Sequence, residues 1–410
     1  MPRLLAMPAV LAALAAFMYG ADAGRVQYQR LAAPSLDPYT NSPSRAQQRW
    51  LRDHFMRMAV FSPYFDRKIS WFPNSLVYQD LYGIPRESPL VRDHPEWVLR
   101  DREGQRLYIP WGCAQGTCPQ YAADIANPQF RDWWIARATS VLSHGYLGLW
   151  IDDVNMEFRV SDGSGRQVPP LDSTTGSLMT WEAWRGYVAA FVEQIRAAFP
   201  KAEIVHNSIW FAGPPGVRDA DPAIQRQIRA ADNLNVERGI ATDSGLAGGT
   251  GIWSLYALLA YIDRIHSAGR GVTLEEYELT RPMQEYGLAG YFLISSGNDR
   301  FGDFSTNPSN WWSGYDVVLG TPLGPRTYHD GVYQRAFSCG LVLAGEPGLH
   351  PQEVTLPGIF ETLDGRSVRS VHLSGREGVL LRGCESGAVD TIRDRRGPPP
   401  QPKVISNTEP

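Results

Sequence analysis

The chain has 410 residues, of which 43% are hydrophobic and 20% are charged, and its 43 acidic and 39 basic side chains give a formal net charge of -4. This composition excludes disorder as the main state of the chain, and the lack of a basic excess excludes a general attraction to nucleic acid or anionic membranes. The 13 Trp, 18 Tyr, 15 Phe, 39 Gly and 31 Pro residues favour long structured loops and surfaces on which rings stack.

The first 23 residues read as a signal peptide. Arg3 supplies a positive start, residues 4–18 form an apolar stretch interrupted only by Pro8, and residues 21–23 (Ala-Asp-Ala) fit a small-x-small cleavage site. A transmembrane helix is the weaker alternative because the apolar run is shorter than the roughly 20 residues that a spanning helix needs. We therefore expect a secreted or periplasmic protein whose mature chain has no membrane span.

Strands alternate with helices over residues 24–325. The predicted strands are 58–64, 76–81, 121–125, 146–151, 203–205, 234–236, 272–277 and 300–304, and the predicted helices are 46–55, with Ser42 or Ser44 as N-cap, 128–143, 181–199, 222–231, 255–267 and 281–296. Eight such units favour a closed (β/α)8 TIM barrel over an open, doubly wound parallel sheet. The first strand-to-helix turn also lacks the glycine fingerprint of a dinucleotide or nucleoside triphosphate site.

Three segments stand apart from this alternation. A long insertion, residues 85–119, is rich in Trp and should cover one end of the sheet, and we expect substrate specificity to depend on it. Residues 326–384 show short alternating segments between Pro-Gly, Asp-Gly and Ser-Gly turns, which predict a small antiparallel, β-sandwich-like domain. Residues 385–410 form a Pro-rich tail that we expect to be disordered.

The four cysteines favour two disulfides, Cys113 with Cys118 and Cys339 with Cys384. A four-cysteine zinc site is the alternative. Zinc sites usually combine two close pairs, and the second pair here is far apart in sequence. We therefore predict disulfides, which agree with export, and no bound metal or other cofactor.

Carboxylates gather where the predicted barrel strands end. In a TIM barrel the carboxyl ends of the strands form the active site. Asp152 and Asp153 are the clearest candidates, because two adjacent carboxylates after a buried apolar strand lose hydration unless a partner or a reaction uses them. The alternative is that one of them caps a loop or pairs with an arginine.

Cleavage of a glycosidic bond needs a second carboxylate. Glu237, at the end of the sixth predicted strand, is the first candidate, and a structural ion pair with the adjacent Arg238 is its alternative role. Glu275 and Glu276 are weaker candidates, because a glutamate at a strand end can simply face solvent.

Two parts of the chain resemble a known group. Residues 121–134 (Tyr-Ala-Ala-Asp-Ile-Ala-Asn-Pro-Gln-Phe-Arg-Asp-Trp-Trp), together with the strand end at 148–155, resemble barrel glycoside hydrolases, in particular the hypothetical glycosyl hydrolases. Residues 315–324 and 335–343 resemble the junction between barrel and β-domain in that group. The α-galactosidase and α-glucosidase/α-xylosidase families are distantly similar.

This resemblance implies roles for particular residues. In the similar families a retaining nucleophile ends strand four and an acid/base ends strand six, which places the nucleophile on Asp152, or else Asp153, and the acid/base on Glu237. Those families usually have Asp at the strand-six position, so the stereochemistry of the reaction is left open. The fifth strand ends in His206 and Asn207, which departs from the α-amylase arrangement of an acid at that place.

Other side chains at the strand ends are candidates for substrate binding. Aromatic faces can stack on sugar rings, although core packing is the more common role of such residues, and polar groups can hold hydroxyls. The candidates are Tyr64, Asp80, Asp124, Trp150, His206, Asn207, Trp210, Glu276 and Asp303.

We therefore predict a secreted glycoside hydrolase that cleaves a polysaccharide or oligosaccharide with two carboxylates and with retention. Two alternatives stay open at this point. One is a barrel that binds carbohydrate without cleaving it, in the handling of an exopolysaccharide. The other is a metal-dependent hydrolase built on Asp152, Asp153 and His206.

Overall fold

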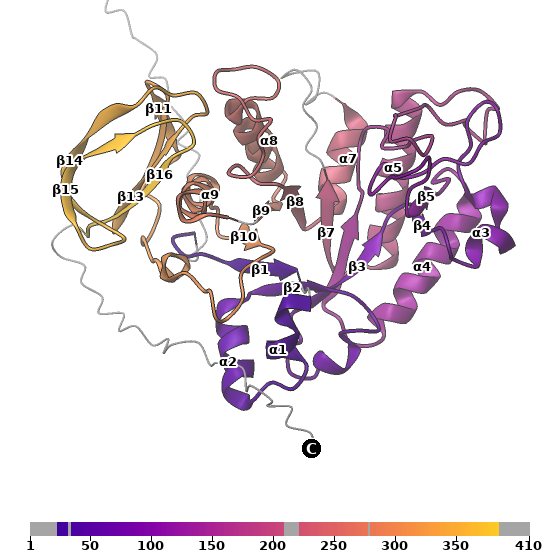
Figure 1. Cartoon of the computed structure of the whole chain (residues 1–410), viewed down its shortest axis with the longest axis horizontal. Coiled ribbons are helices and arrows are strands. Elements are labelled where there is room, and N and C mark those ends of the chain that lie inside the picture. The colour runs from indigo at the N-terminus through magenta and orange to yellow at the C-terminus, as the bar shows by residue number, and fades with distance from the viewer. Residues whose placement is uncertain (1–22, 32–33, 209–220, 278, 385–410) are drawn as a thin grey trace, which may run out of the picture.

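Short strands with two parallel neighbours each close into an eight-stranded barrel in the computed structural model, which describes residues 23–31, 34–208, 221–277 and 279–384 (Figure 1). The predicted fold class is thus confirmed. The signal peptide, Trp210 and the C-terminal tail fall outside the described residues. In the order in which they pair around the barrel, the strands are β1 (Tyr28–Leu31), β10 (Arg300–Asp303), β9 (Gly271–Glu276), β8 (Asn233–Glu237), β7 (Glu203–Ser208), β6 (Gly148–Asp152), β3 (Ser75–Asp80) and β2 (Arg57–Val60).

Helices connect the strands and surround the barrel (Figure 1). Ser44 is the N-cap of the second helix and forms a capping box with Gln47, which agrees with the predicted start. Asn127 caps the fourth helix, where the sequence places a helix start before Pro128. The helices are α1 (Asp37–Thr40), α2 (Arg45–His54), α3 (Leu90–Asp93), α4 (Pro128–Leu142), α5 (Trp181–Ala198), α7 (Pro222–Ala230), α8 (Leu255–Ser267) and α9 (Arg281–Ile294).

One strand assignment made from the sequence is wrong, and one barrel strand was not predicted. The predicted barrel strand at 121–125 is instead part of β5 (Gln120–Ala122), which pairs antiparallel with β4 (Gly83–Pro85) outside the barrel. The first barrel strand, β1, was not predicted. Its sequence has no apolar run, because Gln29 and Arg30 stand in the middle of the strand. Both side chains are nevertheless buried, since Gln29 accepts a hydrogen bond from Arg300 and Arg30 donates one to the carbonyl of Thr306.

The barrel interior is layered. At the amino ends of the strands, Glu203 pairs with Arg57 at 2.8 Å and with Arg300 at 2.5 Å. Above these charges lies an apolar layer composed of Ala59, Leu76, Trp150 and Val205. The carboxyl ends carry polar side chains. The opposite faces of the strands pack, with the helices, into the main core.

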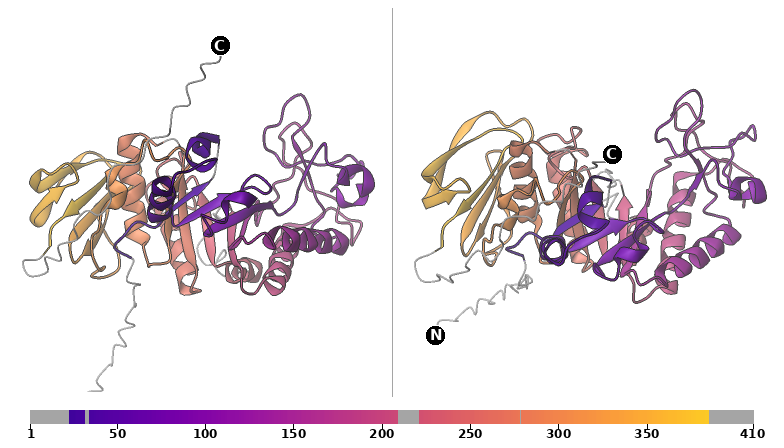
Figure 2. Two further views of the ribbon diagram at one scale, coloured as in Figure 1. Left: turned by 90° about the horizontal axis from the view of Figure 1, so that it is seen from below. Right: turned by 60° about the horizontal axis from the view of Figure 1, so that its bottom comes forward.

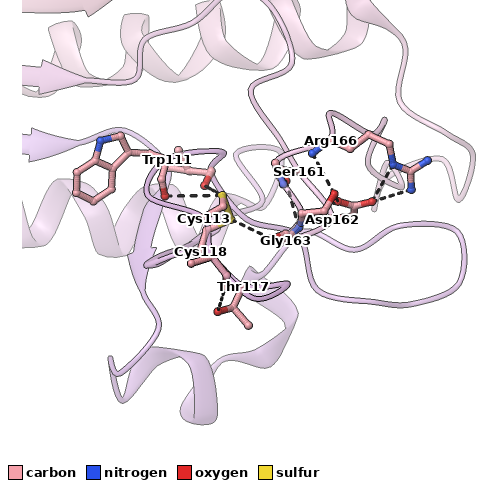
Figure 3. The surroundings of a disulfide bond; sticks show 12 residues. Trp111, Cys113, Thr117, Cys118, Ser161, Asp162, Gly163 and Arg166 are labelled. Atoms are coloured by element: carbon pink, nitrogen blue, oxygen red, sulfur yellow. Dashed lines mark hydrogen bonds and ion pairs between the residues drawn. A yellow bond between two sulfur atoms is a disulfide. The ribbon is translucent and has the colours of Figure 1, made fainter.

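The insertion forms a separate lobe beside the barrel (Figures 1 and 2). It contains α3 and is flanked by β4 and β5, and it is bridged to the β6–α5 loop between Tyr108 and Ser161. The predicted disulfide between Cys113 and Cys118 is present and lies against Gly163 of that loop (Figure 3). The disulfide thus closes a short loop where two long connections meet.

A six-stranded antiparallel sheet follows the barrel and lies on the side opposite the insertion (Figures 1 and 2). It packs on α9, where Arg335 donates hydrogen bonds to the carbonyls of Phe292 and Ser295. The second predicted disulfide, Cys339 with Cys384, is also present. The division into a barrel over 24–325 and a domain over 326–384 stays a prediction. In pairing order, the strands are β11 (Thr327–His329), β12 (Val332–Phe337), β13 (Gly340–Gly345), β16 (Gly378–Arg382), β14 (Gln352–Thr362) and β15 (Ser367–Leu373).

Among the described residues, no helix is both long enough and apolar enough to cross a membrane.

Candidate active site

Five neighbouring strands, β3, β6, β7, β8 and β9, bring polar side chains to one rim of the barrel. Alternate residues of a strand face the same side, so the last inward-facing residues of these strands converge at their carboxyl ends. The strand register places Asn207 beside Asn235, and Glu237 beside Glu275. The converging side chains are Tyr78, Asp152, Asn207, Asn235, Glu237 and Glu275.

A continuous chain of hydrogen bonds crosses this rim. The hydroxyl of Tyr78 donates to Oδ2 of Asp152 at 2.7 Å, and Nδ2 of Asn207 donates to its Oδ1 at 2.8 Å. Nδ2 of Asn235 donates both to Oδ1 of Asn207, at 2.7 Å, and to Oε2 of Glu275, at 2.5 Å. Because both oxygens of Asp152 accept hydrogen bonds, its carboxylate is held in one orientation.

Glu237 shares a donor with Asp152. Nδ2 of Asn207 lies 3.4 Å from Oε2 of Glu237 as well as 2.8 Å from Oδ1 of Asp152, so these two oxygens are no farther apart than the sum of the two distances. Tyr277 also forms a hydrogen bond with Glu237. Arg238 is exposed, and the described residues show no ion pair between it and Glu237. The two predicted catalytic carboxylates therefore lie together.

Asp153 and Asp80 surround Asp152 with further negative charge. Burial, and then the charge of Asp152, raise the pKa of Asp153 to about 7, against the opposing effect of Arg159. Burial and the charges of Asp153 and Asp152 raise the pKa of Asp80. A proton is thus retained within this carboxylate group near neutral pH.

The backbone fixes the positions of Asp80 and Asp153. Oδ1 of Asp80 accepts from the amides of Tyr82, at 2.9 Å, and Gly83. A side chain at Gly83 would collide with this carboxylate, since a Cβ there would lie 2.3 Å from Oδ2 of Asp80. Asp153 has a positive φ of 55° and accepts from Nδ2 of Asn155 at 2.9 Å, so it faces a different direction from Asp152.

Glu275 is a buried carboxyl group that accepts a hydrogen bond from the side chain of Asn235. It is 5% exposed, and burial raises its pKa to about 8, with the charges of Glu237 and Asp152 adding to the effect and Asn235 and Arg30 opposing it. Glu275 is therefore protonated at neutral pH.

Four of the predicted substrate-binding residues contact other groups. His206 faces away from Asn207, with Nδ1 3.2 Å from Nε2 of Gln227, and burial lowers its pKa to about 3. Asp124 accepts from the amide of Ala126 and from the hydroxyl of Ser173. In the described chain neither residue contacts the Asp152 rim.

The other two hold loops. Asp303 accepts from the amide and hydroxyl of Ser305, both at 2.8 Å. Glu276 is fully buried and accepts from the amides of residues 240–242, and a Cβ at Gly239 would lie 2.2 Å from its Oε1. Glu276 thus anchors the turn that directly follows Glu237 and Arg238.

The two predicted aromatic residues that the structure describes differ in exposure, one inside the barrel and one on a loop. Trp150 is 3% exposed and stacks inside the barrel on Tyr78, with ring centroids 5.6 Å apart. Tyr64 is 40% exposed on the loop after β2, and the ammonium of Lys68 lies 3.8 Å from its ring centre. Of the two, only Tyr64 can offer a face to a sugar.

Sequence reasoning missed several members of the site. Tyr78 and Asn235 lie on predicted strands. Alternate residues of a strand face the same side, so Tyr78 could have been placed on the side of Leu76 and Asn235 on the side of Glu237. Phe61, 41% exposed and 4.8 Å from the ring of Tyr78, follows β2 and had no distinguishing pattern. Its position is set by the barrel alone.

The described residues contain no group of three or more His, Cys, Asp or Glu arranged to hold a metal ion. The alternative site of Asp152, Asp153 and His206 is not assembled, because His206 points toward α7 while Asp152 points into the rim.

The model of hypothetical glycosyl hydrolase family 15 matches residues 77–341. No curated protein matches the chain.

The chain is also similar, at low sequence identity, to three solved structures. The glycoside hydrolase domain of PelA from Pseudomonas aeruginosa is 12% identical, with a TM-score of 0.40 and coverage of 69% of this chain and 95% of that one. TtGalA, an α-galactosidase from Thermus thermophilus, is 16% identical, with a TM-score of 0.39 and coverage of 71% and 60%. A GH36 α-galactosidase, AgaA, from Geobacillus stearothermophilus is 10% identical, with a TM-score of 0.42 and coverage of 89% and 56%.

Proposed function

The chain belongs to hypothetical glycosyl hydrolase family 15, and from this we propose that it is a glycoside hydrolase in which Asp152 and Glu237 are the catalytic carboxylates. The observation that carries the proposal is the shared donor, Nδ2 of Asn207, between one oxygen of each carboxylate. Two carboxyl groups facing one space are what hydrolysis of a glycosidic bond requires.

Asp152 is proposed as the nucleophile and Glu237 as the acid/base. Asp152 accepts hydrogen bonds from Tyr78 and Asn207, which orient its carboxylate and stabilise its negative charge. Glu237 ends the sixth barrel strand, across Asn207 from Asp152. In this arrangement Glu237 protonates the leaving oxygen while Asp152 attacks the anomeric carbon, and Glu237 then activates a water that releases the sugar.

Retention of configuration is the proposed outcome. Retaining enzymes hold their carboxyl groups about 5–5.5 Å apart, whereas inverting enzymes need about 6.5–9.5 Å to admit a water. The single nitrogen that contacts both carboxylates, at 2.8 and 3.4 Å, favours the shorter separation.

The proposed substrate is an oligosaccharide or polysaccharide, and the proposed location is secreted or periplasmic. Phe61 and Tyr64 expose aromatic rings on the loop after β2, and the ring of Phe61 lies 4.8 Å from that of Tyr78. Two disulfides support an oxidising compartment, as does the signal peptide predicted from residues 1–23.

The test uses the full mature chain, a panel of α- and β-aryl glycosides, and the variants D152A and E237A, with the exposed D364N as control. We expect a loss of kcat of at least about 1,000-fold in D152A. Added azide should restore turnover in both variants, giving a glycosyl azide of inverted configuration with D152A and of retained configuration with E237A. D364N should match the wild type.

Each other outcome has a definite meaning. Equal activity in D152A and the wild type would remove Asp152 from the reaction. A wild-type protein that binds glycans but hydrolyses none of the aryl glycosides or polysaccharides tested would contradict the enzymatic proposal in favour of a carbohydrate-binding barrel.

A further inference from the structure

We propose that Glu275 is a positioning residue, which fixes the side-chain amides of Asn235 and Asn207 and so keeps a hydrogen-bond donor between Asp152 and Glu237. This inference rests on the proposed function, because it assigns Glu275 a role relative to the two proposed catalytic carboxylates. Glu275 itself lies one hydrogen bond beyond Asn235 and two beyond Asn207.

The orientation of Asn207 matters because its amide has a donor side and an acceptor side. Its Nδ2 faces Asp152 and Glu237, and its Oδ1 faces Asn235. The reversed amide would place an oxygen against two carboxylates, and the repulsion would push them apart. Only one of the two orientations of Asn207 therefore fits a working site.

Asn235 selects that orientation by donating to Oδ1 of Asn207. The same nitrogen donates to Oε2 of Glu275, so both of its hydrogens are used. Within the described residues, Oδ1 of Asn235 has no hydrogen-bond partner, so no contact on the carbonyl side holds this amide. Two acceptors therefore fix Asn235, which lies on β8. Asn207 is on the neighbouring strand β7, and Glu275 is on the neighbouring strand at the other side, β9.

Glu275 fills this role as a neutral acceptor. Its burial raises its pKa to about 8, so below that pH it offers a carboxyl oxygen to Asn235 without adding a charge beside Glu237 and Asp152. The charged and titratable groups that face it are Glu237 from β8, Asp152 from β6, Arg30 from β1 and Tyr277, which follows β9. An amide side chain would supply the same oxygen.

The competing role for Glu275 is direct proton transfer to the substrate. E275Q separates the two roles, because a glutamine still accepts from Asn235 but cannot transfer a proton. E275L removes both functions. The matched control is T273V. Thr273 lies two residues before Glu275 on the same face of β9, and the substitution removes only the hydrogen bond from its Oγ1 to Asn233.

The experiment measures kcat and KM for an aryl glycoside that the wild type hydrolyses, together with thermal unfolding of each variant. E275L leaves one buried amide hydrogen of Asn235 without an acceptor, which corresponds to a change of about 10–100-fold in rate. We expect E275L to lower kcat by that factor with KM little changed, E275Q to stay within about threefold of the wild type, and T273V to match the wild type. In the double variant N235A/E275L the two losses should not add, since each breaks the same chain.

A second readout does not need activity. In protein labelled with 15N-asparagine, the side-chain amide signal of Asn207, identified by its loss in N207L, should keep its position and slow exchange in E275Q and lose both in E275L.

The outcomes are separable. An E275Q variant as slow as E275L would overturn the positioning role in favour of proton transfer. An unchanged Asn207 signal in E275L would overturn it even if the wild type hydrolysed no glycoside, whereas that lack of hydrolysis by itself would count against the proposed function only.

Discussion

Among the single residues of the site, Tyr78 contacts both the apolar layer of the barrel and the proposed nucleophile. Tyr78 stacks on Trp150 and donates to Oδ2 of Asp152 at 2.7 Å. Burial and the charge of Asp152 raise the pKa of the Tyr78 phenol, so it stays a donor across the working pH range. The ring of Tyr78 thus packs on Trp150, while its hydroxyl stabilises the negative charge of Asp152.

Replacing the hydroxyl alone should weaken catalysis without unfolding the barrel. Y78F keeps the ring stack and removes the donor to Asp152, which corresponds to about 1–2 kcal/mol, or about a 5- to 30-fold loss of kcat. Y146F is the control, since the hydroxyl of Tyr146 donates to Asp66 at 2.6 Å and not to the rim. Equal kinetics for Y78F and the wild type would show that Tyr78 does not stabilise the nucleophile.

Glu275 should also make stability depend on pH. Its pKa rises from the ordinary glutamate value of 4.5 to about 8 on folding, so the folded chain holds a proton that the unfolded chain releases between these values. The stabilising contribution is complete below pH 4.5 and is lost as pH rises through about 8. E275Q does not titrate, so its stability relative to the wild type should increase by a few kcal/mol, at most about 4, from pH 5 to pH 8.5.

Urea unfolding of both proteins at pH 5, 7 and 8.5 measures this difference. Asp153 and Glu276 contribute slopes of their own, because burial raises the pKa of each to about 7, but they are common to both proteins and cancel. A constant difference over this pH range would mean that Glu275 is ionised at neutral pH, contrary to the neutral role assigned to it.

At the scale of elements, strand identity was predictable where apolar residues formed a run. The strand ending in Asp152 and Asp153 was found this way, because Leu149 and Ile151 are fully buried against the surrounding helices. β1 was missed because its inward positions are Gln29 and Leu31, and only the distant Arg300 explains why a glutamine is buried there. Residues 121–125 look like a barrel strand locally, and only the pairing of β5 with β4 assigns them to the insertion.

The same limit applies to the site. The carboxylates at strand ends could be predicted, since the barrel brings those ends together. The hydrogen bonds from Asn207 and Asn235 could not be predicted, because the role of an inward-facing asparagine depends on which side chain the neighbouring strand places next to it. Glu276 and Glu275 are adjacent in sequence, yet one holds a loop and the other bonds to Asn235.

The insertion should influence binding of long substrates. Trp111 is 65% exposed beside the disulfide that closes the loop at Cys113 and Cys118 (Figure 3). Directly after the insertion, Nε2 of Gln120 donates to Oδ2 of Asp80 at 3.3 Å. Stacking of an aromatic ring on a sugar-like face corresponds to about 1 kcal/mol.

We therefore expect W111A to raise KM for a polysaccharide about fivefold and to leave the kinetics on an aryl monosaccharide unchanged. W181A, which removes another partly exposed tryptophan but at the start of α5, is the control. A loss that is equal on both substrates would indicate that Trp111 supports the fold of the insertion.

At the scale of the whole molecule, the two ends of the barrel interior use charge in opposite ways. The rim concentrates carboxylates with few cations, whereas the amino ends pair Glu203 with both Arg57 and Arg300. Arg300 also donates to Gln29, so this one cluster joins β1, β2, β7 and β10, which are not all neighbours in the sheet. The apolar layer of Trp150 and its neighbours separates the two ends.

Glu203 should therefore stabilise the closed barrel as a whole. Burial alone would raise the pKa of Glu203, but Arg300 and Arg57 outweigh it and lower the pKa. Its contribution is present above the unfolded pKa of 4.5 and is lost as pH falls through the lower folded value. E203Q leaves the buried guanidinium group of Arg300 and the partly buried one of Arg57 without a counter-charge, which is expected to cost about 3–5 kcal/mol at pH 7.

Urea unfolding at pH 7 tests this expectation against E193Q, which breaks the exposed pair with Arg226 and should cost less than about 1 kcal/mol. The barrel should still close in E203Q, because the main core around it is unchanged, so kcat per folded molecule should stay near that of the wild type. If E203Q lowered kcat as strongly as it lowered stability, the two ends of the barrel would be coupled through the Trp150 layer, and the rim could not be treated as a site that the barrel merely carries.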